Sequence, residues 1–495
     1  MANTIVGRVK ELRELQDIIH SDRAEFVAIY GRRRIGKTYL INNFFAGSKC
    51  TYFQTVGFQD GSRAVQLENF TDDLSKCFYN NEPMEPAKNW KEAFKRLTKA
   101  IEIPAKNRRN KIVLFFDELP WMATHRSGFL NALEYYWNRY WCNMPNMKLV
   151  ICGSSASWII KKIINNKGGL HNRVTKEIAL RPFVLYETKE YLERLGCNFT
   201  VNQILEIYMA VGGVPYYLNY IKKNLSAMQN INNLCFRKDG ALFGEFEKLF
   251  KSLFKEADAY IEIIRIISKT RHGIPRSELE HACKLSGKGG SFSEKLKDLE
   301  DAGFVLSFLP FKHNKHGIFY KVIDEYSLFY FKWIEPEEKS LLKLEINSNF
   351  WENKYKTPAW NNWSGYAFES ICYKHLDVIR RVLNIPEGSR ASPWQYVGKD
   401  SGEDGAQIDL VFDREDKAFT ICEIKFTEEP YVISKAYVKN LINKEKAFVS
   451  KTKTKKQIFL TIISANGLKD NIHSGGLVSG VVMAEDFFNS KYIEG

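Results

Sequence analysis

Strand-like and helix-like patterns alternate over the first part of the chain. Mostly apolar runs occur at residues 26–30, 112–116 and 147–152, the last with Lys148 in it, and polar or glycine residues follow each run. A helix is expected at residues 10–20, and a long helical insertion at about 61–103 separates the first two runs. Apolar strands that alternate with helices are typical of a parallel sheet with helices on its faces. The pattern therefore predicts an α/β domain over residues 1–185.

The pattern changes three times after this domain. Residues 186–255 read as a mostly helical region that is interrupted by a glycine-rich turn at 211–215. Residues 256–335 give three short helices, at 260–268, 276–283 and 291–302, and a hairpin of 303–308 with 317–322. Residues 345–495 give a second α/β unit, with a helix at 364–377 and strands at 407–412, 418–424 and 457–463. The middle layout is that of a winged helix-turn-helix, so we expect four domains.

A glycine-rich segment joins the first apolar run to the helix that follows it. Its residues are Gly31, Arg32, Arg33, Arg34, Ile35, Gly36, Lys37 and Thr38. In this spacing the glycines let backbone N–H groups close around phosphate oxygens, Lys37 neutralises the β- and γ-phosphate charge, and Thr38 ligates Mg²⁺. The following helix adds its positive dipole end. The segment predicts a phosphate-binding loop with ATP and Mg²⁺ as ligands, rather than an ordinary glycine-rich turn.

Polar residues also follow the other two apolar runs. Asp117 and Glu118 end the second run, as expected of the acidic strand of a P-loop protein. We expect Asp117 to hold Mg²⁺ through water and Glu118 to polarise the attacking water, which indicates hydrolysis. Ser154, after the third run, is expected either to contact the γ-phosphate or its water, or to cap the next helix together with Ser155.

Composition limits the number of domains, the location of the protein and its partners. The 495 residues require about three or four domains, and no apolar run approaches the roughly 18 residues of a membrane span. The N-terminus lacks a signal-peptide core, so we expect a cytoplasmic protein. Nine cysteines without a CxxC pair indicate neither a zinc site nor a disulfide framework. A net charge of +14, with basic runs at 106–111 and 451–456, fits a polyanion partner.

Four residues of the last domain form a possible metal site, called the carboxylate site below. They are Glu369 on the expected helix, Asp409 on one strand, and Glu423 and Lys425 on the next. Residues two apart on a strand share a face, so Glu423 and Lys425 should point toward what Asp409 addresses. Asp409 and Glu423 would ligate Mg²⁺, and Lys425 would orient or activate a water. A salt bridge between Lys425 and Asp409 is the structural alternative.

The helix at 291–302 occupies the recognition position of the winged helix. It carries Lys295 and Lys297 together with Glu294, Asp298, Glu300 and Asp301. That many acids suit a DNA groove poorly, because both surfaces would be negative. A structural or protein-contacting winged helix is therefore expected at least as strongly as a DNA reader.

Together these motifs resemble the archaeal-type ATPases of the AAA+/STAND group, whose C-terminal domain is often related to the PD-(D/E)XK nucleases. The resemblance is carried by segments 6–8, 31–38, 117–118, 153–155, 212–215 and 324–331, and by the carboxylate site. It implies that Val6, Gly7 and Arg8 lie near the adenine and that Arg173 is an arginine for the γ-phosphate, in its own or a neighbouring subunit. It also implies that Pro215 marks a nucleotide-sensing lid. Ile408 stands where the nuclease motif's name has proline.

We therefore expect an α/β protein: a P-loop NTPase parallel sheet with a helical lid, a winged helix-turn-helix and a C-terminal restriction-endonuclease-like domain. The resemblance implies ATPase activity, with metal-dependent nuclease activity as a further possibility. Expected partners are nucleic acid, DNA more than RNA, and further copies of the chain, with no membrane. The alternatives are a signalling or scaffold ATPase, or a DNA-binding regulator, with a catalytically inactive C-terminal domain.

Overall fold

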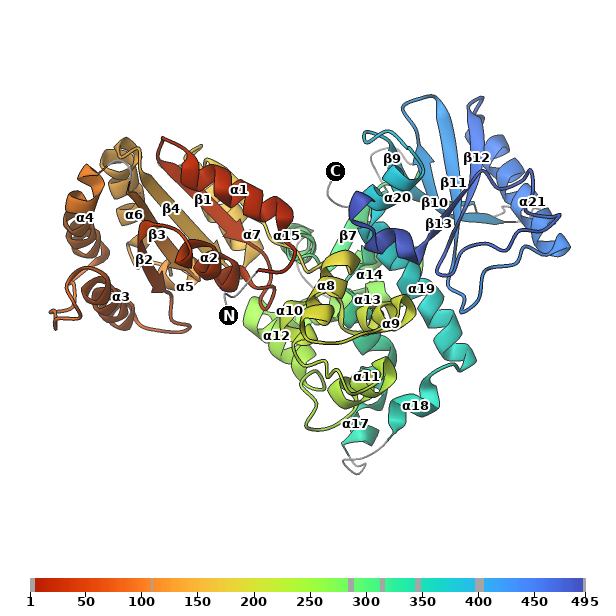
Figure 1. The fold of residues 1–495 in the computed structure, drawn as a ribbon, viewed down its shortest axis with the longest axis horizontal. Helices are drawn as coiled ribbons and strands as arrows, with labels where there is room; N and C mark the ends of the chain where they lie inside the picture. The colour runs from red at the N-terminus through yellow and green to blue at the C-terminus, as the bar shows by residue number, and fades with distance from the viewer. Residues whose placement is uncertain are drawn as a thin grey trace. The chain divides into compact units, whose positions relative to one another are not determined.

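The computed structural model describes residues 5–107, 110–283, 289–311, 317–342, 349–396 and 405–492. The chain divides into two compact units, Met1–Arg181 and Pro182–Gly495 (Figure 1). Part of the basic run at 106–111 lies outside the described residues. No helix in the described residues is long and apolar enough to cross a membrane.

The first unit is built on a parallel sheet of five strands. They are β1 (Glu25–Tyr30), β2 (Cys50–Val56), β3 (Lys111–Asp117), β4 (Met147–Gly153) and β5 (Lys176–Ala179), in the order β2-β3-β4-β1-β5. The three apolar runs become the three adjacent central strands, which confirms the expected parallel α/β fold. The sequence patterns did not indicate β2 and β5, because these strands lie at the edges and are only partly buried.

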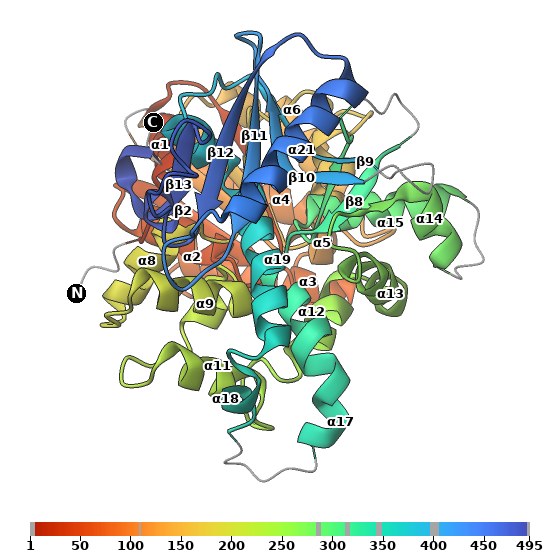
Figure 2. The ribbon, with the colours of Figure 1, turned by 90° about the vertical axis from the view of Figure 1, so that its right-hand side faces the viewer.

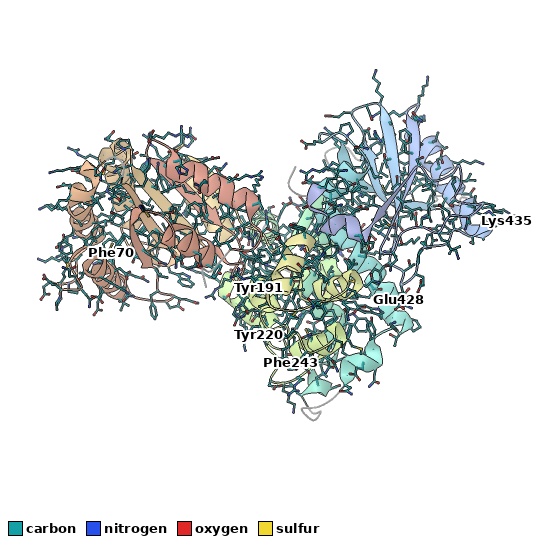
Figure 3. All side chains as sticks on the ribbon, viewed as in Figure 1. Phe70, Tyr191, Tyr220, Phe243, Glu428 and Lys435 are labelled. Carbon is teal, nitrogen blue, oxygen red and sulfur yellow. The ribbon has the colours of Figure 1, made fainter. Side chains whose placement is uncertain are left out.

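Helices cover both faces of this sheet. They are α1 (Val9–His20), α2 (Lys37–Ala46), α3 (Arg63–Phe78), α4 (Trp90–Lys106), α5 (Leu119–Met122), α6 (Phe129–Arg139), η1 (Trp141–Asn143), α7 (Ala156–Ile159) and the π-helix η2 (Ile160–Ile164). One core lies under α3, α4 and α6 and includes Phe70, which Figure 3 labels. The other core lies under α1 and α2. Alternate residues of β1 enter the two cores, as the strand period of two requires.

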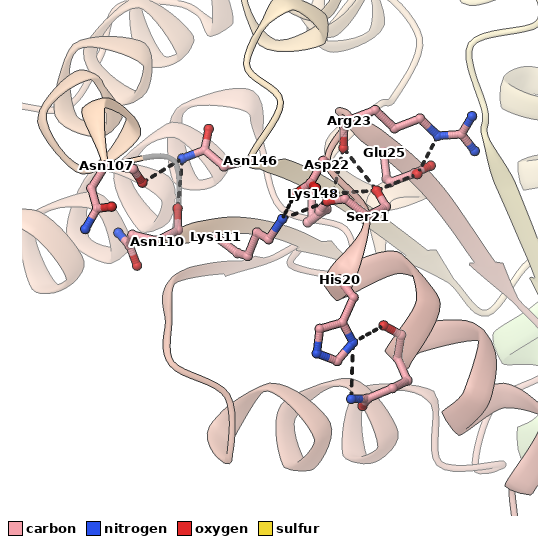
Figure 4. A network of polar contacts seen from close by, with 11 residues as sticks. His20, Ser21, Asp22, Arg23, Glu25, Asn107, Asn110, Lys111, Asn146 and Lys148 are labelled. Atoms are coloured by element: carbon pink, nitrogen blue, oxygen red, sulfur yellow. Dashed lines mark hydrogen bonds and ion pairs between the residues drawn. The ribbon is translucent and has the colours of Figure 1, made fainter.

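The amino-terminal edge of the sheet is held by a buried lysine (Figure 4). Lys148 of β4 is fully buried, and its Nζ donates to the Ser21 carbonyl at 2.9 Å and the Arg23 carbonyl at 2.6 Å. Lys111 of β3 also donates to the Ser21 carbonyl, at 2.7 Å. Burial lowers the pKa of Lys148 to about 8. These contacts fasten the turn between α1 and β1 to the two neighbouring strands.

The second unit begins with helices and a winged helix. The helices are α8 (Leu185–Arg194), α9 (Val201–Val211), α10 (Pro215–Leu218), α11 (Ala227–Cys235) and α12 (Glu245–Leu253). The winged helix comprises α13 (Ala257–Ser268), β6 (Ile274–Pro275), α14 (Arg276–Ala282), α15 (Gly289–Asp301), β7 (Val305–Phe308) and β8 (Phe319–Val322). Its antiparallel strands follow the order β6-β8-β7. The three helices and the hairpin that the sequence predicts are all present.

A second sheet lies toward the C-terminus. Its order is β13 (Gly480–Met483), β12 (Gln457–Ser464), β11 (Ala418–Lys425), β10 (Ala406–Asp413) and β9 (Arg390–Tyr396). The preceding helices are α16 (Glu325–Phe329), the π-helix η3 (Tyr330–Ile334), η4 (Glu335–Glu337), α17 (Glu338–Leu341), α18 (Phe350–Lys354), α19 (Pro358–Lys374) and α20 (Leu376–Val382). Helix α21 (Lys435–Thr452) follows β11, and η5 (Ala484–Phe488) and η6 (Ser490–Tyr492) end the described chain.

The second sheet is covered by helices on two faces. Helix α21 packs over β10 (Figure 2), whereas α19 packs against β11 on the side of the larger core. That larger core includes buried residues from Phe183 to Phe488, and a separate, smaller core lies under α21. The helical region, the winged helix and one face of the C-terminal sheet share this larger core, and the predicted division into domains stays a prediction.

The glycine pair before Pro215 is explained by close packing inside this second unit. Gly212 has a φ of +65°, which favours glycine. A Cβ on Gly213 would lie 1.9 Å from the Phe183 carbonyl oxygen, and the Phe183 N–H donates to the Gly213 carbonyl at 2.7 Å. The turn between α9 and α10 therefore sits directly on the segment that leads into α8.

Replacing Gly213 by alanine is expected to lower the free energy of unfolding by about 2–3 kcal/mol, because backbone must move to admit the methyl group. Gly365→Ala is the matched control. A Cβ there meets nothing within 4 Å in the middle of α19, so this change should stabilise the chain by up to about 1 kcal/mol. Urea unfolding of both variants measures the difference, and equal midpoints would contradict the packing argument.

A buried histidine joins α8 to the end of α19. His375 Nδ1 lies 2.8 Å from the Ile371 carbonyl, and the Leu185 N–H donates to Nε2 at 3.1 Å. Nε2 must therefore be the bare acceptor and Nδ1 must carry the proton, so the ring is neutral. Burial lowers the pKa of His375 to about 4, from an ordinary 6.5.

The unfolded chain therefore protonates this group at a higher pH than the folded chain does. The free energy of unfolding should fall as the pH drops from 6.5 toward 4, and this one group should contribute about 2 kcal/mol of loss between pH 7 and pH 5. His375→Gln keeps an acceptor but cannot titrate, so it should reduce the pH dependence by that amount. His281→Gln, on an exposed position of α14, is the control, and urea titrations at both pH values provide the test.

Candidate functional site

The glycine-rich segment forms a loop between β1 and α2, at the carboxyl end of the central strands. Gly31 has a φ of +149°, and a Cβ on it would lie 2.3 Å from the Leu180 carbonyl oxygen. Gly36 has a φ of +88° and opens onto free space. Glycine is therefore required at Gly31 by the neighbouring chain and at Gly36 by the backbone turn. This is the phosphate-binding loop that the sequence predicts.

Lys37, at the start of α2, lies under this loop. Its Nζ donates to the Gly31 carbonyl at 2.8 Å and the Arg32 carbonyl at 2.9 Å. Both partners are uncharged carbonyl groups, so neither forms an ion pair with the lysine. A phosphate placed there would receive charge-assisted hydrogen bonds from Lys37 and from the loop amides.

Thr38 connects the loop to the neighbouring acidic strand. Its hydroxyl donates to Asp117 Oδ2 at 2.6 Å, and Asp117 is buried at the end of β3. A hydroxyl and a carboxylate oxygen at this separation are the kind of donor set that Mg²⁺ prefers. The residues therefore fit Mg²⁺, which would be held by Thr38 and by Asp117, directly or through water.

Glu118 is held in place by the strand on the other side of β3. Its Oε2 accepts from the Ser154 N–H at 3.0 Å and the Ser154 hydroxyl at 2.9 Å. Glu118 also has a φ of +47°, a strained value for a residue with a side chain. Ser155 occupies the N-cap position of α7 without a side-chain hydrogen bond. Ser154 lies beside the acidic strand, and its contact with the γ-phosphate or the attacking water stays a prediction.

The segment before α1 lies beside the phosphate loop. Arg8 is buried, its Nη2 donates to the Ile35 carbonyl at 3.2 Å, and its Nη1 donates to the Arg181 carbonyl at 2.7 Å. Gly7 and Arg8 both have a φ of +59°. The turn thus brings Val6, Gly7 and Arg8 to the loop, and their contact with adenine stays a prediction.

Two expected nucleotide residues are not brought to this loop within the first unit. Arg173 is exposed and lies two residues before Thr175, whose N–H donates to the Phe26 carbonyl near the amino end of β1. This is the edge of the sheet opposite to the loop, so Arg173 does not face the phosphate site of its own chain. Pro215 belongs to the second unit, where it begins α10.

In the carboxylate site, Glu423 is surrounded by cations. Its carboxylate pairs with Lys425 at 2.9 Å and Lys444 at 2.7 Å, and the Tyr437 hydroxyl donates to it at 2.7 Å. Burial alone would raise its pKa, but the two lysines and the hydroxyl hold the pKa of Glu423 below its usual value. Glu423 and Lys425 do share one face of β11, as the strand period predicts.

Asp409 faces the same environment from β10. Its Oδ2 accepts from the Ile424 N–H at 2.9 Å. Burial, with Glu423 and Glu369 nearby, raises the pKa of Asp409 to about 6. The structural alternative was a salt bridge between Lys425 and Asp409. In the structure Lys425 pairs with Glu423 on its own strand instead.

Glu369 on α19 is paired with residues of the winged helix rather than of the C-terminal sheet. Lys321 of β8 lies 2.7 Å from its Oε1, and Arg271 lies 3.2 Å from its Oε2. Among the described residues, no group of three or more acidic, histidine or cysteine side chains is arranged to hold a metal ion. In this arrangement the carboxylate site does not fit Mg²⁺, because cations of the chain already pair with Glu369 and Glu423.

Sequence reasoning did not identify Lys444, Tyr437, Lys321 or Arg271. Lys444 and Tyr437 lie on α21, a helix that the sequence patterns did not predict. Its few buried positions give a weak amphipathic signal, and nothing in the spacing connects it to Glu423. Lys321 was assigned to a strand of the hairpin, but its partner lies 48 residues away in the sequence.

Two acids of α15 accept hydrogen bonds from other parts of the winged helix. The Tyr260 hydroxyl donates to Asp298 at 2.7 Å, and the Ser307 N–H donates to Glu300 at 3.2 Å. Lys295 is paired with Glu256 at 2.8 Å. These contacts favour a structural winged helix over a helix that reads DNA bases.

The parallel sheet, the phosphate loop, Lys37, Thr38 and Asp117 together define a P-loop nucleotide-binding protein. Residues 5–221 match the model of an ATPase domain found predominantly in Archaea. This match covers less than half of the chain, and it supports an ATP-binding ATPase of the P-loop type.

Three similar proteins match more of the chain. An uncharacterized protein of Methanocaldococcus jannaschii is 26% identical over 430 residues, which is 86% of this chain and 88% of that protein. A Walker-type ATPase of Pyrococcus abyssi is 18% identical, with a TM-score of 0.47, and the match covers 66% of this chain and 96% of that one. The ORC2 protein of Aeropyrum pernix, solved as ADPNP–ADP complexes, is 15% identical, with a TM-score of 0.42 and coverage of 69% and 98%.

Removing the ammonium group of Lys37 is expected to weaken ATP binding by about 10- to 100-fold, the contribution of a charge-assisted hydrogen bond to phosphate. Lys49→Ala, on an exposed position just after α2, is the control and should bind normally. Calorimetric titration of Lys37→Ala with a non-hydrolysable ATP analogue and Mg²⁺ measures the change. Unchanged affinity in Lys37→Ala would contradict the role of the loop.

Proposed function

We propose that this ATPase hydrolyses ATP with Mg²⁺ in the first unit and acts on nucleic acid through the second. For hydrolysis, the proposal is carried by the contact chain from Thr38 to Asp117 and from Glu118 to Ser154. Glu118 would polarise the attacking water after Ser154 releases it, and Asp117 would hold the metal ion. The resemblance to AAA+ proteins suggests assembly of several copies, in which the exposed Arg173 would serve a neighbouring subunit.

For nucleic acid, the proposal rests on α21. This helix carries exposed lysines at Lys435, Lys439, Lys446 and Lys451, with Lys435 labelled in Figure 3. The same helix directs Lys444 and Tyr437 onto Glu423 in the carboxylate site. A basic surface that leads to carboxylates and lysines suits a phosphodiester backbone, and the chain as a whole carries a charge of +14. We propose DNA before RNA as the polymer and a nuclease-like role for this region.

A second candidate function is a signalling or scaffold ATPase with a catalytically inactive C-terminal region. The observation that favours it is the pairing of Glu369 and Glu423 with cations of the chain itself. In that case the carboxylate site would be structural, and changes in it would alter stability but no activity.

A cleavage assay separates the two candidates. Purified wild type is incubated with Mg²⁺ or Mn²⁺ and linear, single-stranded DNA or RNA, with and without ATP, beside Lys37→Ala and Lys425→Ala. The proposal expects cleavage that falls at least about 100-fold in Lys425→Ala, the usual contribution of a residue that assists proton transfer. ATP dependence that is lost in Lys37→Ala would show coupling between the two units.

Lys469→Ala, an exposed lysine of the same unit, should cleave normally. Intact nucleic acid in every reaction, together with normal ATP hydrolysis, would favour the scaffold.

A further inference from the structure

Helix α4 carries a row of lysines along its exposed side. Lys91, Lys95 and Lys99 are four residues apart, so they lie one above the other on one side of the helix. All three are exposed, and within the described part of the chain none of them forms an ion pair with an acid. Glu92, on the same helix, is instead paired with Arg96 at 2.5 Å. The row therefore presents positive charge that the chain does not neutralise.

Two exposed tyrosines lie beside this row. Tyr135 of α6 and Tyr140, which directly follows α6, are 39% and 38% exposed. Helix α6 packs beside α4 (Figure 1), and Lys91 Nζ lies 5.5 Å from the ring centre of Tyr135. The guanidinium carbon of Arg139 lies 5.8 Å from the same ring centre. The rings and the cations thus form one surface, called the α4–α6 surface below, which comprises Lys91, Lys95, Lys99, Tyr135, Arg139 and Tyr140.

Both exposed rings rest on one buried tyrosine, Tyr136, which is 5% exposed. Tyr140 stacks on it with 5.5 Å between the ring centres, and Tyr135 meets it edge-on at 5.2 Å. Tyr136 in turn contacts Phe94 and Trp141 in the core under α4 and α6. Because the exposed rings are already ordered, a flat ligand that stacks on them loses little binding energy to the ordering of side chains.

Flat rings among cations suit the chemistry of single-stranded nucleic acid, whose bases stack on aromatic side chains and whose phosphates bind lysine and arginine. An exposed acid, Glu102, continues the lysine row toward the end of α4, but the four cations of the surface outweigh it. A duplex would engage only the cations, because its bases are stacked on one another. An acidic protein segment would likewise engage only the cations, because carboxylates offer no flat face to the tyrosines. A single strand is therefore the partner that uses both parts of the surface.

We propose that the α4–α6 surface binds single-stranded nucleic acid, with bases stacked on its two tyrosines and phosphates held by its four cations. The inference goes beyond the proposed function, because it gives the first unit a nucleic-acid contact of its own and depends neither on α21 nor on the carboxylate site. The surface covers the core under α3, α4 and α6, whereas the phosphate loop leads into α2 on the other core. The strand and ATP therefore occupy different places on the first unit.

Fluorescence anisotropy of labelled single-stranded oligothymidine with the full chain, over a range of salt concentrations, tests the inference. Tyr135→Ala with Tyr140→Ala should weaken binding by about 10-fold or more, because stacked bases are lost, and should leave the salt dependence unchanged. Lys95→Ala with Lys99→Ala should lower the slope of log affinity against log salt by about 1.4, because each phosphate contact with a single strand contributes about 0.7. The two variants thus measure stacking and phosphate binding separately.

Matched variants make the result specific. Tyr79→Ala removes an exposed tyrosine at the end of α3, and Lys10→Ala with Lys49→Ala removes two exposed lysines of the same unit. Both should bind oligothymidine like wild type, and ATP affinity should be normal in every variant that folds. Unchanged oligothymidine affinity in the tyrosine variant would overturn the inference. Equal affinity for a duplex of the same length, or equal competition by polyglutamate, would also overturn it.

A background variant separates this surface from the contact proposed for α21. Lys435, Lys439 and Lys446, which are exposed on α21, are changed to alanine together, and the measurements are repeated. A loss caused by the tyrosine change that persists in this background supports the α4–α6 surface. Binding that disappears in the background, without any effect of the tyrosine change, would overturn the surface and leave the contact at α21. Absence of binding by wild type would overturn both.

A measurement on the unaltered protein covers the case in which the tyrosine variant does not fold. A single strand that carries iodouracil is bound to wild type and irradiated, because this base forms covalent links with aromatic rings on which it stacks. Mass spectrometry of the digested protein should find the linked base on Tyr135 or Tyr140. Links that miss both tyrosines would overturn the inference.

Discussion

Buried charge must be paired, and this constraint organises the second unit. Glu369 pairs with Lys321, Glu325 pairs with Lys374 at 2.6 Å, and Glu423 pairs with Lys444. Each of these acids is almost completely buried, so each would be costly without its partner. The pairs join the winged helix to α19, α16 to α19, and α21 to β11. The electrostatic requirement therefore sets which elements must lie together, and the large apolar core fills the space between them.

The first unit uses a different constraint, which is the common direction of its strands. Because β1, β3 and β4 are adjacent and parallel, the residues that follow each strand meet at one edge. Lys37, Asp117 and Ser154 come from three distant parts of the sequence. They lie at the same edge because each follows one of these strands. The opposite edge carries the Lys148 network, which ties strands together and contains no comparable loop. Binding and stability are thus placed at opposite ends of the same sheet.

Local patterns predicted the parts of the site that depend on local structure. The loop from Gly31 to Thr38 and the acidic strand end at Asp117 follow from spacing and from the strand before them. The pairs made by Lys321 and Lys444 could not be predicted, because each depends on how distant elements pack. Lys321 reads as an ordinary outward residue of a hairpin strand until α19 is placed beside it. The family resemblance suggested a nucleotide-binding role for Arg173. It could not show on which edge of the sheet this residue lies.

The phosphate loop and the carboxylate site hold their lysines in different electrostatic environments. Lys37 donates to two carbonyl groups, which orient its ammonium group but leave its charge uncompensated. Lys321 and Lys444 lie against carboxylates, so their charge is already neutralised within the chain. An incoming phosphate gains the whole charge of Lys37, whereas a ligand of the second unit must first break a pair. The phosphate loop is therefore ready for its ligand as it stands, whereas Glu369 and Glu423 are already paired with cations of the chain.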